Sequence, residues 1–320
     1  MTEAQRNAGG ESLVTVLLAL GANVAIAVAK TAAAVLTGAA SMLAEAAHSW
    51  ADAGNEVFLL IANRRGGKPA DASHPLGYGR EVYVWSMFAA LGLFAVGAGV
   101  SITHGVQELI TPEPASDFLV AYVVLAISFV LEGISFTQAW RQSRRAATSR
   151  HIDLLDHVLK TSDPTLRAVF FEDAAALVGL LIAGTGIALH EVTGSTVPDA
   201  VGSILVGVLL GVVALILIGR NRDFLVGELA DPAARDYVLR ALMASPDVDR
   251  VTLLRLQVMG AGKVFIVGAV DLVGDAREHD VAAVLARVEH RVREHPAVVG
   301  VVLSLSEPQE PSLEPGPATR

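Results

Sequence analysis

The sequence contains no cysteine. This absence excludes a disulfide framework, a thiolate metal site and a cysteine redox motif. Any metal ion that the chain binds must therefore be held by histidine, aspartate and glutamate, whose donor atoms are nitrogen and oxygen. Dense basic runs are also absent, and the formal net charge is −9. Both features argue against nucleic acid as a partner.

Charged residues are scarce as well. They make up 18% of the 320 residues, against about 25% in an ordinary soluble domain, while hydrophobic residues make up 52%. The mean hydropathy is +0.51. The deficit is uneven, because long apolar stretches fill residues 12–220 and the remainder has an ordinary soluble composition. This contrast predicts a membrane domain followed by a small soluble domain.

The composition also predicts the character of both ends of the chain and the domain boundaries between them. The first ten residues, MTEAQRNAGG, lack a charged region and a small-residue cleavage site, so we expect no signal peptide. We expect a cytosolic N-terminal tail over 1–11, a transmembrane domain over 12–220 and a cytosolic C-terminal domain over 221–308. The Pro-rich residues 309–320 are expected to be a disordered tail.

Six apolar segments have the length of roughly 20 residues that a helix needs to cross the hydrocarbon core. Gly and Ala are frequent inside them, as is typical of helices that pack closely in lipid. The predicted spans are 13–36, 41–63, 83–110, 117–140, 167–190 and 198–219.

Lysine and arginine are confined to alternate connections between these spans. The connections 37–41, 111–116 and 191–197 contain neither residue. The basic connections carry Arg64, Arg65, Lys68 and Arg80 after the second span, Arg141, Arg144, Arg145, Arg150 and Lys160 after the fourth, and Arg220 and Arg222 after the sixth. Because basic loops stay in the cytosol, both termini are predicted to be cytosolic, in a multi-pass protein of the plasma or inner membrane.

The C-terminal region has the pattern of a small α+β domain. Asp231 followed by Pro232 predicts the start of a helix that runs to about residue 243. Two apolar runs joined by a Gly-rich turn predict a hairpin, and a charged helix and a last strand follow. The expected order is αββαβ, with strands over 250–258, 264–273 and 298–305 and the second helix over 278–294.

The second span carries a polar stripe. Glu45, His48, Asp52, Asn55 and Glu56 fall within an arc of roughly 100° on a helix. A hydrogen-bonded packing seam is the plainer interpretation. The alternative is a functional site, because each ionisable residue at mid-bilayer costs at least about 2.5 kcal/mol.

The spacing within the stripe favours a metal site. His48 and Asp52 lie four residues apart, so both side chains reach one ion from adjacent turns. Two ligands are too few, and the fifth span supplies Glu172 and Asp173. A histidine with carboxylates suits zinc or cobalt(II), and manganese or iron(II) stay open because oxygen dominates.

Two motifs are similar to those of a known family. Residues 41–52, SMLAEAAHSWAD, and residues 71–80, DASHPLGYGR, resemble signatures of the cation diffusion facilitators, also called the cation efflux or zinc transporter family. The resemblance covers about residues 12–308. It implies a homodimer that exports a divalent metal, zinc first, by metal/proton antiport with alternating access.

The resemblance also implies a ligand set. Family members bind the transported ion through a pair of residues in the second span and a pair in the fifth. The matching positions are His48, Asp52, Val169 and Asp173. Val169 departs from the pattern because it cannot bind metal, which leaves Glu172 or Glu45 as the fourth ligand. The adjacent Glu-Asp in the fifth span resembles the branch that contains the mitochondrial zinc transporter.

Some family members hold an accessory metal in the loop after the second span. Asp71 and His74 match that site, but Tyr78 stands where a further histidine would complete it. The alternative is a turn shaped by Gly77 and Gly79.

The C-terminal domain has few candidate ligands. It contains His279, His290 and His295, which are too dispersed for a metal cluster and favour a dimerisation module without metal. In the membrane domain, Lys30 and Glu132 are expected either to form buried ion pairs or to line a water path.

The sequence therefore predicts a zinc exporter with no resident cofactor. Its partners are expected to be the metal ion, protons, membrane lipid and a second copy of the chain. Two alternatives stay open: a membrane-embedded metal-dependent hydrolase, and an exporter that prefers cobalt, manganese or iron.

Overall fold

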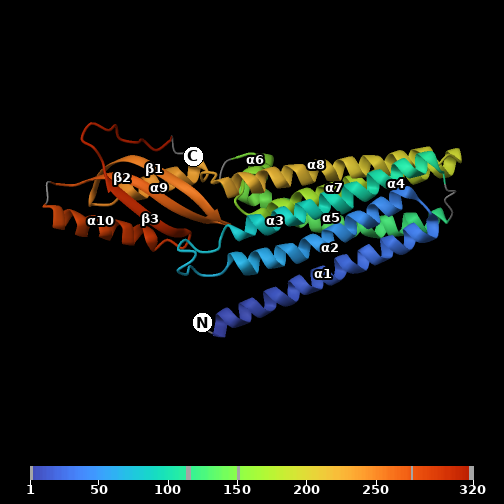
Figure 1. Cartoon of the computed structure of the whole chain (residues 1–320), viewed down its shortest axis with the longest axis horizontal. Coiled ribbons are helices and arrows are strands. Elements are labelled where there is room, and N and C mark those ends of the chain that lie inside the picture. Colours follow the sequence, from blue (N-terminus) through green and yellow to red (C-terminus); the bar gives the residue numbers. More distant parts are fainter. Residues whose placement is uncertain (1–2, 113–116, 150–151, 275–276, 317–320) are drawn as a thin grey trace. The chain divides into compact units, whose positions relative to one another are not determined.

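The computed structural model describes residues 3–112, 117–149, 152–274 and 277–316 (Figure 1). Long helices form its first part, and each predicted span falls on one helical rod to within a residue. The third rod is continuous but contains a short π-helical segment. The rods are α1 (Glu3–Thr37), α2 (Ala40–Gly66), α3 (Glu81–Gly92) with η1 (Leu93–Ala98) and α4 (Gly99–Ile110), α5 (Phe118–Ser149), α7 (Pro164–Thr193) and α8 (Val197–Val226).

Within the described part of the chain, five rods are long and apolar enough to cross a membrane. The exception is α2, whose polar stripe lowers its hydropathy although its 27 residues give sufficient length. Large apolar side chains such as Leu119 and Ile134 of α5 are exposed, as expected for helices that face lipid. The predicted helical membrane domain is therefore confirmed, with five candidate spans rather than six.

Glycines let the helices approach closely. A Cβ atom at Gly105 of α4 would lie 2.7 Å from the Ala200 carbonyl oxygen of α8. A Cβ atom at Gly207 of α8 would lie 2.6 Å from a side-chain carbon of Ile102. Small residues at these crossings permit tight van der Waals packing, which is the main attraction between helices in lipid.

The described chain divides into two compact units. The first contains residues up to Ile61, Trp85–Gln142 and Thr165–Arg220. The second contains Ala62–Val84, Ser143–Pro164 and the chain from Asn221 onward. The second unit thus includes the ends of several rods, the loop after α2 and a short helix, α6 (Leu154–Lys160), besides the expected C-terminal domain.

The C-terminal domain has the predicted αββαβ order. Strand β2 pairs antiparallel with β1 and parallel with β3. At the start of α9, Asp231 accepts a hydrogen bond of 2.8 Å from the amide of Ala233 and acts as the N-cap, as predicted. The elements are α9 (Pro232–Met243), β1 (Val248–Gly260), β2 (Lys263–Leu272), α10 (Glu278–Arg293) and β3 (Val298–Leu305).

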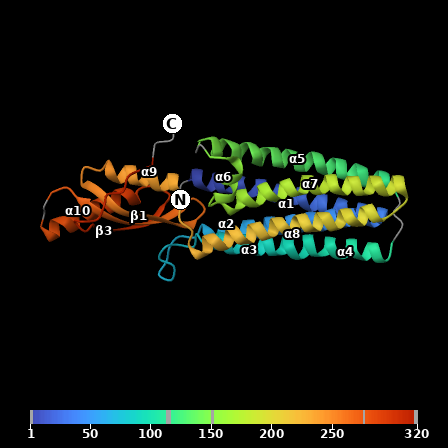
Figure 2. The same ribbon diagram turned by 90° about the horizontal axis from the view of Figure 1, so that it is seen from above.

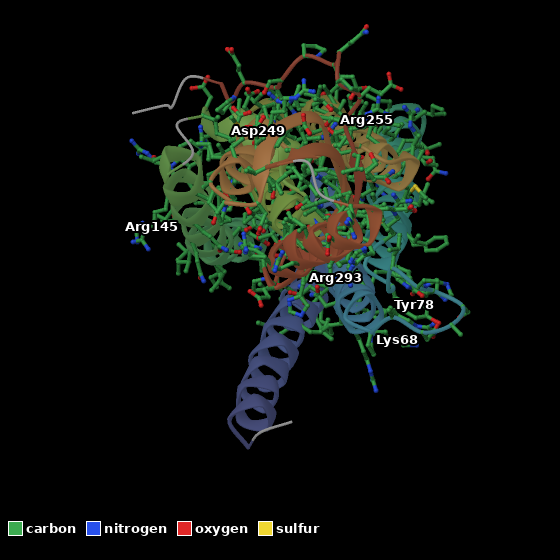
Figure 3. All side chains as sticks on the ribbon, turned by 90° about the vertical axis from the view of Figure 1, so that its left-hand side faces the viewer. Lys68, Tyr78, Arg145, Asp249, Arg255 and Arg293 are labelled. Atoms are coloured by element: carbon green, nitrogen blue, oxygen red, sulfur yellow. The ribbon has the colours of Figure 1, made fainter. Side chains whose placement is uncertain are left out.

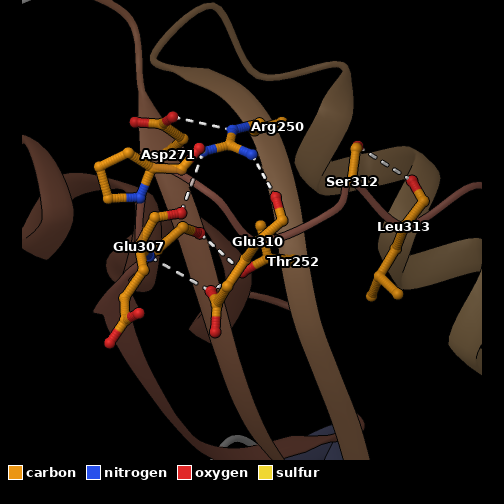
Figure 4. A network of polar contacts seen from close by, with 9 residues as sticks. Arg250, Thr252, Asp271, Glu307, Glu310, Ser312 and Leu313 are labelled. Carbon is orange, nitrogen blue, oxygen red and sulfur yellow. Dashed lines mark hydrogen bonds and ion pairs between the residues drawn. The ribbon is translucent and has the colours of Figure 1, made fainter.

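The chain after β3 runs along β1 in the described residues (Figure 4). The guanidinium of Arg250 donates to backbone carbonyls of this segment, those of Glu307, Pro308 and Glu310. The amide of Leu313 donates to β1 at 2.7 Å. These hydrogen bonds join the segment to β1 as far as Leu313, and the amide of Gly316 donates to Asp236 of α9 at 3.0 Å, whereas a disordered tail was expected over 309–320. Residues 317–320 lie outside the described part.

Candidate metal site

A cavity of about 120 Å³ lies among four helices of the first unit, α1, α2, α5 and α7 (Figure 2 shows the helices). This volume has room for several water molecules. Most of the lining residues are polar, and their polar groups carry oxygen. The lining consists of Asn23, Ile26, Ser49, Asp52, Asn55, Glu56, Leu59, Glu132, Ser135, Val169, Glu172 and Asp173.

Hydrogen bonds across the cavity link its helices. The Asn23 amide donates to Glu56 Oε1 at 3.0 Å, the Asn55 amide donates to Glu172 Oε2, and the Ser135 hydroxyl donates to Asp173 Oδ2 at 2.6 Å. These bonds join α1 to α2, α2 to α7, and α5 to α7. Glu56, Glu172 and Asp173 are thus held at the cavity wall by neutral donors, which do not compensate the charge of an ionised carboxylate.

Several oxygen atoms at this wall have no hydrogen-bond partner among the described residues. They include Oδ1 of Asp52 and Asn55, Oε2 of Glu56 and Oε1 of Glu172, although all are buried. Asn55 is 3% exposed and Glu172 is 7% exposed. A buried acceptor without a partner costs roughly 1–3 kcal/mol, and more when charged. The donor set therefore fits a cation.

His48 lies beside the cavity rather than in its lining. Its side chain is 1% exposed, and Nε2 is 3.4 Å from Asp52 Oδ2. Neither ring nitrogen has a hydrogen-bond partner in the described part of the chain. The predicted pairing of His48 with Asp52 on adjacent turns is therefore present, and the imidazole retains a nitrogen that is able to bind metal.

Asp52, Glu172 and Asp173 are the predicted ligands that the fold brings around one cavity. Val169 lines the same cavity and contributes only carbon. As they stand, no three His, Asp or Glu side chains of the described residues lie close enough together to hold one ion. Ion binding therefore requires the carboxylates to converge across the cavity, which their free oxygens permit.

Glu45 does not line this cavity. Its Oε2 accepts a hydrogen bond of 3.0 Å from Lys30 Nζ, and both side chains are fully buried. The other oxygen abuts Gly179 of α7, where an added Cβ atom would lie 2.7 Å away. Of the two interpretations offered for Lys30, the buried ion pair is the one observed. Glu45 is therefore the least accessible of the five predicted ligands.

The cavity also contains residues outside the predicted ligand set. Glu56 belongs to the polar stripe but not to the predicted ligands, and Glu132 is expected either to form a buried ion pair or to line a water path. Glu132 lines the cavity. An acid in an otherwise apolar span is a signal that could have marked it. Asn23 and Ser135 carry no such signal, because single amide or hydroxyl groups are common in membrane helices.

The loop after α2 satisfies its own polar groups. Asp71 Oδ1 accepts hydrogen bonds from the Ser73 amide and hydroxyl at 2.9 and 2.7 Å and from the His74 amide at 2.8 Å. Oδ2 accepts from the Tyr78 hydroxyl at 2.7 Å. These bonds, the Ser73 hydroxyl first, hold the pKa of Asp71 well below its usual range. Lys68 lies over the Tyr78 ring, 5.6 Å from its centroid (Figure 3).

Glycines shape this loop. Gly77 has a φ of +79°, which favours glycine. A Cβ atom at Gly79 would lie 2.3 Å from the Met259 carbonyl oxygen at the end of β1, so the loop backbone passes directly against the strand. The close approach and the filled acceptors of Asp71 support the interpretation of this segment as a structural turn.

The tail histidines do not gather in the described residues. His279 is close to Asp280, and His290 to Glu294, each as a separate exposed pair. The ring of His295 instead meets Tyr237, with centroids 6.2 Å apart.

Comparison with known proteins gives a consistent set of relatives. The sequence profile described as "Cation efflux transmembrane domain" matches residues 16–226. Metal tolerance protein C4 of Arabidopsis thaliana is 37% identical over 227 residues, which cover 71% of this chain and 50% of the relative. The mitochondrial proton-coupled zinc antiporter SLC30A9 of Homo sapiens is 34% identical over 227 residues, 71% of this chain and 40% of the relative. The match thus spans half or less of these relatives.

Proposed function

Because the chain belongs to the cation efflux family, whose members are transporters rather than enzymes, we propose that it exports a divalent transition metal, zinc first, in exchange for protons. The observation that carries the proposal is the oxygen-lined cavity between α2 and α7, with buried acceptors that lack partners. The relative named as a proton-coupled zinc antiporter supports zinc and protons as substrates.

The ligand set that we propose combines family positions with the local geometry. His48, Asp52 and Asp173 occupy family positions, and Glu172 supplies the donor that Val169 lacks. The free oxygen of Glu172 at the cavity wall supports this assignment. Glu45 is left out because it lies outside the cavity lining and its Oε2 binds Lys30. The adjacent Glu-Asp and the similarity to the mitochondrial zinc antiporter support assignment to the branch of that relative.

Access to the site follows from the direction of the helices. On α2 the cavity residues lie between His48 and the arginine-bearing end, and on α7 they lie near its first residue. These two ends are on the same side of an alternating bundle. If that side is cytosolic, as the basic loops indicate, the cavity receives metal from the cytosol. Alternating access would then expose the same ligands to the other side.

Proton exchange fits the energetics of export. Moving a divalent ion outward against 100 mV costs roughly 4.6 kcal/mol, and each proton that enters returns about half of this. Metal binds deprotonated ligands, so protons that arrive from outside displace it. Carboxylates and an imidazole are able to bind either a metal ion or protons, so the same groups serve both transported ions.

The remaining parts of the proposal concern assembly and location. We propose a homodimer in the plasma or inner membrane, with both termini in the cytosol and lipid around the exposed apolar side chains. The dispersed tail histidines support a C-terminal domain that dimerises without metal. The Asp71–His74 loop is proposed to shape a turn rather than to hold an accessory ion.

Zinc uptake into proteoliposomes that contain the full chain tests this function. A liposome interior that is more acidic than the medium should drive zinc inward in exchange for protons. The reversed pH difference should not. Empty liposomes and liposomes carrying Asp52→Asn serve as controls. Hydrolysis of a test ester without zinc flux would support the alternative of a membrane-embedded hydrolase instead.

A further inference from the structure

Glu132 enters the cavity from α5, a helix that carries none of the ligand positions of the family. We propose that Glu132 determines which metals are accepted, by adding an oxygen donor that lets a six-coordinate ion such as Mn²⁺ be carried beside zinc. This inference rests on the proposed transport function and names its substrate class more closely.

The packing of α5 against α7 fixes the position of Glu132. One turn further along α5, Ser135 donates to Asp173 Oδ2 at 2.6 Å, so this face of α5 is turned toward the ligands. Beyond it, the rings of Phe136 and Trp140 pack on Phe170 of α7, with centroids 5.5 and 6.0 Å away. These contacts make the Glu132 carboxylate a built part of the cavity wall.

The cavity offers more oxygen donors than a four-coordinate ion uses. Carboxylates come from α2, α5 and α7, and Asn55 adds an amide oxygen that has no partner among the described residues. No histidine is in the lining, and His48 lies outside it with Nε2 3.4 Å from Asp52 Oδ2. Zinc sites are usually tetrahedral with nitrogen or sulfur donors, whereas Mn²⁺ favours six oxygen ligands. The lining therefore suits both coordination numbers.

The charges around Glu132 point to a cation of high charge. Glu132 lines one cavity of about 120 Å³ together with Asp52, Glu56, Glu172 and Asp173. The nearby Lys30 ammonium group is bound to Glu45, which lies outside this lining. When these carboxylates are ionised, a divalent ion among them relieves their mutual repulsion better than a monovalent ion does.

Parallel zinc and manganese uptake under the same pH jump tests the role of Glu132. The variants are Glu132→Gln, Glu132→Asp and, as a matched control, Glu191→Gln, which removes a carboxylate that the Tyr122 hydroxyl contacts at the end of α7. We expect wild type to carry both metals. Glu132→Gln should raise the KM for manganese about tenfold or more and leave the KM for zinc within about threefold, because only manganese needs the additional donor. For Glu132→Asp, the KM for manganese should lie between the values for wild type and Glu132→Gln. Glu191→Gln should match wild type for both metals.

The contrary results separate the two proposals. Wild type that moves neither metal refutes the transport function itself. Wild type that moves zinc but not manganese, or Glu132→Gln that slows both metals equally, refutes only the role of Glu132. Rates are normalised to reconstituted protein, and Glu132→Asp keeps the test decisive if Glu132→Gln does not assemble, because a shorter carboxylate should still reduce manganese uptake selectively.

Discussion

Two Asp–His pairs of this molecule show how surroundings decide the use of the same residue types. Asp71 and His74 lie on an exposed loop, where neighbouring donors fill both carboxylate oxygens. His48 and Asp52 lie inside the helical bundle, where both imidazole nitrogens and one carboxylate oxygen have no hydrogen-bond partner among the described residues. Water satisfies an exposed group at little cost, but a buried one needs a ligand. The bundle pair is therefore the one that fits a metal.

A third pair, formed by Lys30 and Glu45, is buried like the bundle pair but forms its own ion pair. Lys30 and Glu45 are as deeply buried as His48, yet they bind each other at 3.0 Å. Burial alone is thus not sufficient evidence for a ligand. Position at the cavity wall separates Asp52 and Glu172 from Glu45, which lies outside the lining and binds Lys30 through Oε2.

The largest expected effect comes from the cavity carboxylates. Asp52→Asn and Asp173→Asn should each lower zinc uptake by at least about 100-fold, because losing a ligand should exceed the 10–100-fold effect of losing an outer partner. Uptake into proteoliposomes at matched protein amounts measures this. Near-normal zinc flux in either variant would mean that the metal site lies elsewhere, and would contradict the conclusion that the buried pair is the one that binds metal.

Lys30→Met should affect the stability of the folded protein more than its choice of metal. It leaves Glu45 buried without its cation, which should destabilise the protein by about 3 kcal/mol. The double variant Lys30→Met/Glu45→Gln should recover most of this loss, since no uncompensated charge remains. Thermal unfolding in detergent reports the stability. A double variant that is as unstable as the single one would mean that the pair does not act through charge.

His48→Asn should have a smaller and metal-dependent effect. It removes the nitrogen donor, so zinc affinity should fall by about tenfold while manganese affinity changes less, because manganese favours oxygen. Equilibrium binding of each metal to the purified full chain measures both. An equal loss for the two metals would argue that His48 acts only on packing.

The smallest effect on transport is expected for the exposed pair. Asp71→Asn and His74→Ala should leave zinc uptake within about twofold of wild type, because the acceptors of Asp71 already serve the turn. Hydrogen exchange of an Asp71→Ala variant should reveal the structural role instead, since the amides of Ser73 and His74 then lose their acceptor. A strong loss of zinc uptake would revive the accessory metal site.

The pH dependence of this loop follows from the lowered pKa of Asp71. The folded loop favours the charged carboxylate, so its contribution is present above the unfolded pKa of about 3.9 and is lost as the pH falls below it. Protection factors of the Ser73 and His74 amides should therefore stay constant between about pH 5 and 8. A fall in protection within that range would contradict the assignment.

Local signals made much of the fold predictable. Apolar length located the helical rods, and the Asp231-Pro232 cap and the Gly-rich hairpin placed the elements of the C-terminal domain. The segment after β3 was harder to predict because its order depends on Arg250, which lies far away in sequence. Composition alone does not reveal such a partner.

The site was predictable to the extent that it lies on single helices. The i, i+4 spacing of His48 and Asp52 and the adjacent acids of α7 are visible in the sequence. The partner of Glu45 and the position of Glu132 depend on which helices are neighbours, and periodicity does not determine this. Helix packing therefore changed the ranking of ligands, lowering Glu45 and raising Glu132.

Locating the bound metal in the full-length protein tests the central claim most directly. A structure of the zinc-loaded chain with anomalous scattering at the zinc edge should show a peak between Asp52 and Asp173, in contact with carboxylate oxygens. A peak confined to the Asp71–His74 loop or to the C-terminal domain, with none in the bundle, would contradict the account.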